Sequence, residues 1–436
     1  MRGTGAAPTG PARVVVLGAG TGGTIAANRL RRTLGDTALI TVVDRDAQHV
    51  YQPGLLFVPF GRVDPSALLR PRRRFLHPGV GFAEGDVDHV DVPGRRVHLT
   101  GADGREQVLD YDVLVVATGA VLVPEETDGL AAALANGQAH TFYTLEAAAE
   151  LAGALAGFTA GRLVVNVVDL PIKCPVAPLE FCFLADHYFR RRGIRDRVQL
   201  TYATPLDAAF TKPIAARALA DLLKSKGVEL VTEFNTGSVD GAARRLTSYD
   251  GRELAYDLAV VVPLHAGAGY VARSPGLGDA LGFVPVDEHT LQSTQDRHVF
   301  ALGDSTDLPA SKAGSVAHFE GEVLAENVRR HLCGQALAGR FDGHTNCFIE
   351  SGFGKALLID FNYDTEPLPG HYPARIGLPL LRESRLNHLG KLAFEQLYWH
   401  ALLPGRDLPG IGSPMPLRGK HNRLPAAAAA GTTKEK

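Results

Sequence analysis

The first 44 residues contain a pattern that few folds can accommodate. An apolar run at 13–17 is followed by Gly-Ala-Gly-Thr-Gly-Gly at 18–23, a helical stretch at 24–34, and a second apolar run at 38–43 that ends at Asp44. The first glycine permits a tight turn, the second lets a pyrophosphate approach the backbone, and the last lets the helix pack on the strand. Asp44 is placed to accept hydrogen bonds from a ribose hydroxyl. The pattern predicts a βαβ unit that holds a dinucleotide at a helix N-terminus.

A second βαβ-like pattern follows at residues 140–262, without the glycines. Strands are expected near 163–168, 198–202 and 258–263, with helices near 178–192 and 212–227. The first of these strands is followed by Asp-Leu-Pro-Ile-Lys-Cys-Pro at 169–175, where a nicotinamide loop would carry its glycines. A chain that has a thiol, Cys174, at this position is expected to take electrons from sulfur and not from NAD(P)H.

Bulk composition excludes several classes of protein. The chain has 436 residues, 45% of them hydrophobic and 21% charged, and a net charge of −2, so we expect two or three globular domains and no nucleic-acid partner. The basic run at 70–74 is interpreted as a solvated loop. No signal peptide is expected at residues 1–12, and no apolar stretch reaches the roughly 18 residues of a spanning helix. Four cysteines in a chain of this length do not make a disulfide scaffold, and no metal site is expected.

Two further motifs favour FAD as the dinucleotide. The expected strand at 113–117 runs directly into Thr118-Gly119, and the buried strand from Val299 ends at Gly303-Asp304, which would place a carboxylate near a ribityl chain. In this order the motifs resemble the flavoprotein superfamily with two dinucleotide-binding domains. The resemblance implies a backbone contact between Val87 and adenine.

Two cysteine windows make the resemblance more specific. Cys174 lies in Ile-Lys-Cys-Pro-Val-Ala-Pro at 172–178, and Cys347 lies in the segment 344–355, His-Thr-Asn-Cys-Phe-Ile-Glu-Ser-Gly-Phe-Gly-Lys. Together with the missing second glycine loop, these windows resemble sulfide:quinone oxidoreductases over most of residues 13–405. Supporting segments are Tyr51-Gln52-Pro53-Gly54, residues 303–312 and residues 359–363.

The resemblance implies a redox pair formed by Cys174 and Cys347 on one face of the flavin. Hydrosulfide would attack their disulfide or polysulfide bridge by thiol–disulfide exchange, leaving a persulfide on one sulfur and a thiolate on the other. Cys347 is expected to attack the flavin and Cys174 to carry the persulfide, and a membrane quinone would reoxidise the flavin from its other face.

The surroundings of Cys174 carry two further expectations. The adjacent Lys173 and a helix start near Pro178 are expected to lower the pKa of the Cys174 thiol. Glu180 corresponds to an acid that the family places near the sulfur site, where it would accept a proton; a solvent-facing helix glutamate is the equal alternative. Cys182 and Cys333 are interpreted as inert core residues.

The chain departs from the commonest bacterial members of this family. Residues 141–144, Thr-Phe-Tyr-Thr, occupy the region in which those members carry a third cysteine. The arrangement is more similar to the branch that includes the mitochondrial enzyme. The sulfur acceptor therefore stays open between polysulfide, a thiol such as glutathione or coenzyme A, and sulfite.

The C-terminal part is expected to serve the quinone and the membrane. Phe353 and Phe361 are candidates for stacking near a quinone ring, with ordinary core positions as the alternative. Residues 376–404 are predicted to be helical, with Leu386, Leu389, Ala393 and Leu397 at helical spacing and Tyr398 and Trp399 suited to an interface. These features predict a peripheral protein of the cell (cytoplasmic) membrane, with the membrane face and homo-oligomerisation left open.

The expected architecture is therefore an α/β fold with two Rossmann-like dinucleotide-binding domains and a C-terminal membrane-associating segment. The predicted divisions are 1–12 as a disordered N-terminus, 13–139 and 285–340 as the FAD-binding domain, 140–284 as the second domain, 341–424 as the C-terminal region, and 425–436 as a disordered tail. The residues expected to bind FAD are Gly18, Gly20, Thr21, Gly22, Gly23, Asp44, Gln52, Val87, Thr118, Gly119, Gly303, Asp304 and Lys312, the last at the flavin pyrimidine edge.

Three alternative functions stay open at this point. A type II NADH:quinone dehydrogenase shares the fold and the membrane habit but needs a second glycine loop near 168–174. A flavocytochrome c sulfide dehydrogenase passes electrons to a haem subunit. A redox-sensing flavoprotein would use the cysteine pair as a conformational switch without turnover.

Overall fold

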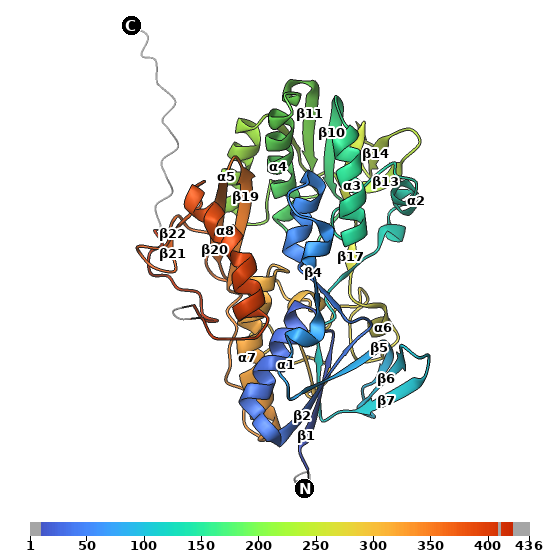
Figure 1. Ribbon diagram of the computed structural model, residues 1–436, viewed down its shortest axis with the longest axis vertical. Coiled ribbons are helices and arrows are strands. Elements are labelled where there is room, and N and C mark those ends of the chain that lie inside the picture. The colour runs from blue at the N-terminus through green and yellow to red at the C-terminus, as the bar shows by residue number, and fades with distance from the viewer. Residues whose placement is uncertain (1–9, 409–410, 422–436) are drawn as a thin grey trace.

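The computed structural model describes residues 10–408 and 411–421 (Figure 1). The expectations for residues 1–9 and for the tail from Pro425 lie outside this described part. None of the helices in the described residues is long and apolar enough to cross a membrane.

The first sheet forms as the glycine pattern predicts. Its strand order is β18-β8-β1-β2-β5-β6-β7, with a parallel centre in which Val14 pairs with Ile40 and with Val113. Helix α1 begins at Thr21, three residues before its predicted start, because the glycine turn is completed at Gly20. The strands are β1 (Ala12–Leu17), β2 (Ala38–Asp44), β5 (Val80–Asp91), β6 (Arg96–Gly101), β7 (Glu106–Asp110), β8 (Val113–Val116) and β18 (Val299–Ala301). The helices on it are α1 (Thr21–Leu34), α6 (Gly269–Ala272) and α7 (Gly314–Leu332).

The second sheet is parallel and has the order β12-β11-β10-β16 (Figure 1). Strands β10, β11 and β16 are buried on both faces over most of their length, as parallel strands usually are, whereas the edge strand β12 is partly exposed. The elements here are α2 (Leu130–Ala135), α3 (Leu145–Gly157), β10 (Gly161–Val167), α4 (Ala177–Arg191), β11 (Val198–Ala203), α5 (Pro213–Ser225), β12 (Val228–Val231), β16 (Leu258–Val262) and the antiparallel β13 (Thr236–Asp240), β14 (Arg245–Ser248) and β15 (Glu253–Ala255).

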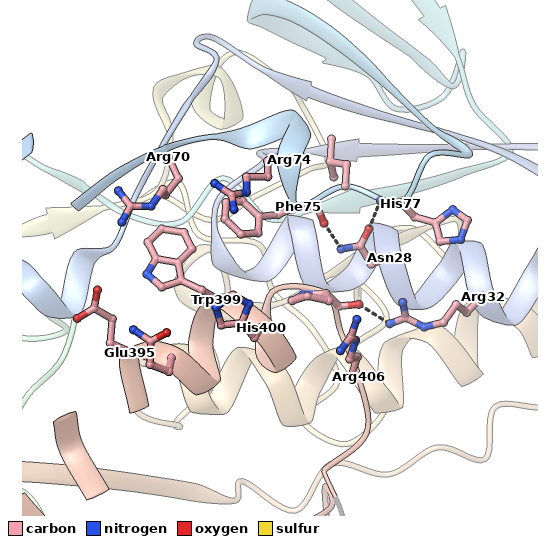
Figure 2. A pocket seen from close by; sticks show the side chains of 13 residues that line it. Asn28, Arg32, Arg70, Arg74, Phe75, His77, Glu395, Trp399, His400 and Arg406 are labelled. Atoms are coloured by element: carbon pink, nitrogen blue, oxygen red, sulfur yellow. Dashed lines mark hydrogen bonds between the residues drawn. The ribbon is translucent and has the colours of Figure 1, made fainter. Parts of the chain in front are cut away.

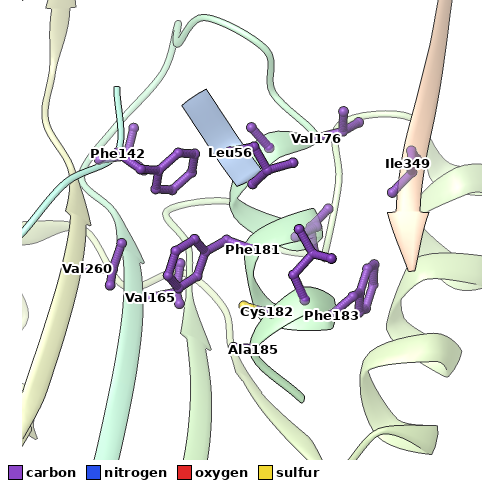
Figure 3. Packing of buried hydrophobic residues seen from close by; sticks show 14 of the residues in the cluster. Leu56, Phe142, Val165, Val176, Phe181, Cys182, Phe183, Ala185, Val260 and Ile349 are labelled. Carbon is purple, nitrogen blue, oxygen red and sulfur yellow. The ribbon is translucent and has the colours of Figure 1, made fainter. Parts of the chain in front are cut away.

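Helix α4 is the centre of the second core (Figure 3). Phe181 lies against Phe142 with ring centroids 5.1 Å apart, and Cys182 is buried among these side chains as predicted. Cys333 contradicts the same prediction. It lies just beyond the last turn of α7 and is exposed, since the helix ends before its face meets the core again.

The chain crosses between the two halves at a two-stranded antiparallel ribbon formed by β9 (Val121–Leu122) and β17 (His265–Ala266). Leu130 packs in the core of the second sheet, while Val284 packs in the core of the first. The domain divisions at 139/140 and 284/285 stay predictions, and this packing favours moving both crossings to the ribbon.

The C-terminal region adds a hairpin and one long helix. The hairpin expected at 344–364 forms from β19 (Thr345–Gly352) and β20 (Lys355–Phe361), and β21 (Gly370–Tyr372) pairs with β22 (Leu378–Leu380). The prediction that residues 376–404 are helical is wrong for the first part of that range. Its start is the strand β22, and α8 (Arg385–Leu397) begins only after Ser384, whose side chain caps the helix by accepting from the Asn387 N–H; a π-turn (Tyr398–Leu402) follows.

Short elements complete the chain. They are β3 (Gln48–Val50), β4 (Leu69–Pro71), and the 3₁₀ segments η1 (Gly35–Thr37), η2 (Gln52–Phe60), η3 (Pro65–Leu68), η4 (Arg72–Arg74), η5 (Pro124–Glu126), η6 (Arg195–Arg197) and η7 (Gly303–Ser305).

Candidate functional site

A cavity of about 670 Å³ runs between the two halves of the molecule. It is bordered by the loop after β1, the ends of β2 and β8, η2, η7, the loop between β10 and α4, the start of β19 and the inner face of α8. Every residue predicted to bind the cofactor lines it except Gly23, and so do all three predicted catalytic residues, Cys174, Cys347 and Glu180.

The glycines of the loop after β1 have two different roles. Gly18 and Gly23 lie so close to backbone atoms that no side chain fits, whereas Gly20 borders open space that a ligand can occupy. Gly18 has φ +94°, and a Cβ there would lie 2.5 Å from the carbonyl oxygen of Ala117. A Cβ on Gly23 would lie 1.8 Å from the carbonyl oxygen of Gly18, so this glycine serves helix packing and does not reach the cavity. A Cβ on Gly20 would meet nothing within 4 Å. The open space beside Gly20, at the N-terminus of α1, fits the pyrophosphate of a dinucleotide.

Asp44 is held in place by two groups. Its Oδ2 accepts a hydrogen bond from the Ala19 N–H at 2.6 Å, and an Arg72 guanidinium nitrogen lies 3.3 Å from its Oδ1. Burial raises the pKa of Asp44, and the charge of Arg72 opposes that shift. Arg72 also donates to the Ala19 carbonyl at 2.7 Å and lines the cavity, so the interpretation of the run 70–74 as a purely solvated loop is wrong at this residue.

The loop after β18 is anchored from helix α7. The Gly303 N–H donates to Oε2 of Glu320 at 2.5 Å, and burial raises the pKa of Glu320 to about 7. The Lys312 ammonium donates to the carbonyl oxygens of Asp304 (3.0 Å) and Thr306 (2.7 Å). Lys312 therefore borders the cavity while its charge is directed at the loop, and its contact with a flavin edge stays a prediction.

Cys174 lies on the loop between β10 and α4, which makes a backbone hydrogen bond to the first half of the molecule. It has φ +49°, its N–H donates to the Lys312 carbonyl at 2.8 Å, and its carbonyl accepts from the Ala177 N–H at 2.9 Å. Cys347 enters the same cavity from β19. Two thiols that are 173 positions apart in sequence (347 − 174) therefore share one compartment with the glycine loop.

The thiols are less acidic than the sequence suggested. Burial raises the pKa of Cys174 to about 12, with a smaller contribution from Glu180; Lys391 and the Ala177 N–H oppose this rise. Burial, then the neighbouring Cys174, also raises the pKa of Cys347. The prediction that Lys173 and the helix start give Cys174 a low pKa is wrong, because burial outweighs the helix start and the cation that acts on this thiol is Lys391.

Glu180 faces inward, so the alternative of a solvent-facing glutamate is excluded. Its Oε1 accepts from the Glu350 N–H at 2.6 Å and from the Lys391 ammonium of α8. Burial raises the pKa of Glu180, and Lys391 opposes the rise. Sequence reasoning missed Lys391. The signal was present, since 387, 391, 394 and 398 recur at helical spacing and 391 is the charged position among them.

The two aromatic residues expected at a membrane interface are buried. The Tyr398 hydroxyl hydrogen-bonds to His49 Nε2 at 2.6 Å and to the Thr21 hydroxyl at 2.7 Å, and Trp399 stacks on Phe75 with centroids 4.9 Å apart. The expectation that both side chains are exposed at an interface is therefore wrong. The reason is that the π-turn carries this end of α8 back onto the glycine loop.

The predicted quinone-stacking residues lie away from the cavity. Phe353 is in the β19–β20 turn, edge-on to His187 at 4.4 Å, and Phe361 is a core residue of β20. Neither lines the cavity, because the hairpin turns them toward α4 and the core. The aromatic lining near α8 comes instead from Phe57, Phe348 and Phe394. In the region without a third cysteine, Phe142 and Tyr143 line the cavity.

Comparison with known proteins agrees with this geometry. Residues 12–321 match the model of the pyridine nucleotide-disulphide oxidoreductase family. The chain is 28% identical over 401 residues to a mitochondrial sulfide:quinone oxidoreductase of Dictyostelium discoideum, covering 90% of this chain and 86% of the relative. A type II NADH:quinone oxidoreductase of Mycobacterium tuberculosis is 36% identical, over 25% of this chain and 23% of the relative. Among solved structures, the sulfide:quinone oxidoreductase of Aquifex aeolicus matches with a TM-score of 0.75 at 19% identity, over 91% of this chain and 92% of that chain, which shows a common fold.

Proposed function

We propose that this chain, which belongs to the pyridine nucleotide-disulphide oxidoreductase family, oxidises hydrosulfide and reduces a membrane quinone. The resemblance to sulfide:quinone oxidoreductases seen in the sequence is confirmed by a relative of that name that spans 90% of the chain. The FAD expected from the sequence agrees with the family and with the open space beside Gly20. Bound FAD supplies a two-electron acceptor on the sulfur side and a two-electron donor for the quinone.

One observation carries the proposal more than any other. Cys174 and Cys347 line the cavity that also holds the cofactor loops, and Cys174 stands where a nicotinamide-binding loop would need glycine. Oxidation of NADH by a flavoenzyme does not require two thiols beside the cofactor, whereas oxidation of sulfide by thiol–disulfide exchange does.

The cysteine pair performs sulfur transfer in a balanced sequence. Hydrosulfide attacks one sulfur of the oxidised Cys174–Cys347 bridge; a new S–S bond forms, the bridge breaks, and the products are a persulfide on Cys174 and a thiolate on Cys347. The persulfide sulfur then leaves to a nucleophilic acceptor (a thiol, sulfite or a further sulfide). Re-forming the bridge between the two thiolates releases two electrons, which bound FAD would accept, so each turnover would oxidise one sulfide to sulfane sulfur.

Protons that are released in this sequence need an acceptor inside the cavity. Glu180 is placed for this role, because it is buried, lines the cavity and raises the pKa of both thiols through its charge. Lys391 holds its carboxylate and offsets part of the cost of burying it. We assign Glu180 as the proton acceptor and Lys391 as the residue that positions it.

The quinone is proposed to approach along α8. The inner face of this helix lines the cavity with Lys391, Phe394 and Tyr398, and its outer face exposes leucines. An apolar substrate that resides in a membrane would reach the cavity through an element of this kind. Peripheral association with the membrane follows as part of the same proposal.

An anaerobic titration of the FAD-loaded protein tests the function. Micromolar sulfide is expected to bleach the visible flavin band, a short-chain quinone to restore it over many turnovers, and NADH to leave it unchanged. Bleaching by NADH and not by sulfide would assign the chain to the NADH:quinone oxidoreductases. Bleaching by sulfide without turnover in the presence of quinone would identify a sensor.

A further inference from the structure

A second cavity, of about 580 Å³, lies at the C-terminal end of α8 (Figure 2). It is formed by α1, by the segment 70–77 and by the chain that leaves α8. Figure 2 shows Arg70 and Arg74 near Trp399, with Arg32 and Arg406 on the other side of His400. The charged side chains that line it are Arg32, Arg70, Arg74, Arg406 and Glu395.

The cavity carries more positive charge than its own carboxylate can neutralise, since four guanidinium groups line it against one glutamate. Arg32 is fixed by donating to the Pro404 carbonyl at 2.5 Å, and Arg70 by donating to the Leu69 carbonyl at 2.8 Å. Carbonyl oxygens orient these groups without cancelling their charge. Burial is the main cause that lowers the pKa of Arg32; the positive charge of Arg29 adds to this shift and the carboxylate of Asp407 opposes it. Such a cluster of donors matches the oxygens of a phosphate.

An apolar surface leads along α8 to this cavity. Leu386, Leu389, Leu392 and Leu397 are 53%, 60%, 53% and 36% exposed. The same helix face continues into Gln396 and His400, which line the cavity. A helix with four exposed leucines that ends at a basic cavity combines the two features with which proteins lie on an anionic membrane surface.

We propose that this cavity binds the phosphate of an anionic phospholipid while the leucine face of α8 enters the acyl region beside it. A free phosphate or a soluble nucleotide would leave the leucines in water, whereas a phospholipid satisfies both surfaces at once. This inference rests on the proposed function only in so far as a membrane quinone requires a membrane.

A lipid in the basic cavity would also set the orientation of α8 relative to the redox cavity. The inner face of α8 lines the redox cavity through Lys391 and Phe394, while the neighbouring Glu395 and Gln396 line the basic cavity. A lipid held in the basic cavity therefore orients α8 with its leucines toward the bilayer. In that orientation the helix separates the redox cavity from the membrane by its own width, about 10 Å.

The test is vesicle co-sedimentation of the FAD-loaded full chain, without sulfide or quinone. The vesicles are either phosphatidylcholine alone or phosphatidylcholine with phosphatidylglycerol. Binding is expected only to the anionic vesicles and is expected to weaken with salt. Arg74→Gln with Arg406→Gln removes two exposed charges from the cavity and is expected to weaken binding about thirty-fold. Leu389→Glu with Leu392→Glu is expected to abolish it.

A matched control removes the same charge elsewhere. Arg105→Gln with Arg297→Gln changes two exposed arginines in the connections that precede β7 and β18, and is expected to leave vesicle binding unchanged. Equal binding to both vesicle types, or equal weakening by the cavity pair and the control pair, would overturn the lipid site. Bleaching by sulfide is measured separately on the same preparation, so a failure of the proposed enzyme activity and a failure of the lipid site remain distinguishable.

Discussion

The molecule contains the same strand–helix–strand unit twice and uses it in two ways. In the first unit Val14 pairs with Ile40, and in the second Leu163 pairs with Leu200, both in parallel. Only residues 18–20 separate β1 from α1, whereas residues 168–176 separate β10 from α4. The frame is common to both units, and the loop is what differs.

The short loop turns tightly and exposes backbone to a ligand. The long loop cannot do so; it crosses to the first half, where the Cys174 N–H bonds to the Lys312 carbonyl. The same dinucleotide fold can therefore bind a cofactor through its glycines, or present a thiol to a cofactor that is bound by the other unit. Loop length and glycine content decide between the two uses.

The most direct way to break this comparison is to remove the thiols. Cys174→Ser and Cys347→Ser are each expected to slow sulfide-dependent bleaching by at least about a thousandfold, because a hydroxyl cannot undergo disulfide exchange. The FAD spectrum should be retained, since the glycine loop is untouched. Stopped-flow absorbance measures the rate.

Cys333→Ser serves as the matched control, because this thiol is exposed beyond α7 and does not line the cavity. If Cys174→Ser keeps the wild-type rate, the long loop has a structural role and the two units do not divide their functions as described.

Glu180→Gln sharpens the role of the second unit. The rate of sulfide oxidation is expected to fall about a hundredfold, as for the loss of a general base. Since burial raises the pKa of Glu180, the wild-type rate should fall as the pH drops through a value above the usual glutamate range, where the carboxylate becomes protonated. A pH–rate profile of the variant should lack this fall.

Glu106→Gln, at an exposed position on β7, is the control and should leave the profile unchanged. An identical pH profile in wild type and Glu180→Gln would remove Glu180 from the proton path.

Gly20→Ala tests the first unit with the smallest expected effect. Gly20 has φ −73°, which alanine tolerates, and no protein atom lies within 4 Å of the added methyl group, so the fold should persist. The methyl group enters the space left for a pyrophosphate, and FAD affinity is expected to fall about tenfold, or about 1.4 kcal/mol. Equilibrium titration of the apoprotein with FAD measures the change.

Gly153→Ala in α3 also meets no atom within 4 Å and serves as the control. FAD affinity should be unchanged there, and helix stability should rise by up to about 1 kcal/mol. Equal FAD affinity in both variants would mean that the first loop does not hold the phosphates.

Local pattern predicted the regular elements and most of the cavity. The strands from Val14, Leu163 and Leu258, and the turns at Gly18 and Gly303, follow from short-range periodicity and backbone requirements, which the sequence carries openly. What the pattern did not give depends on which segments meet in space. Lys391 and Arg72 line the cavity, Tyr398 and Trp399 are buried, and the quinone candidates Phe353 and Phe361 lie outside the cavity.

By itself the sequence determined the two βαβ units and the dinucleotide loop, because residue type and spacing dictate these locally. The choice of Cys174 and Cys347 came from the resemblance to sulfide:quinone oxidoreductases. Only the tertiary structure decided that Cys174 and Cys347 face one cavity, that burial makes their thiols weak acids, and that Lys391 and not Lys173 offsets this. Electrostatic effects depend on depth and distance, and both are set when the chain folds.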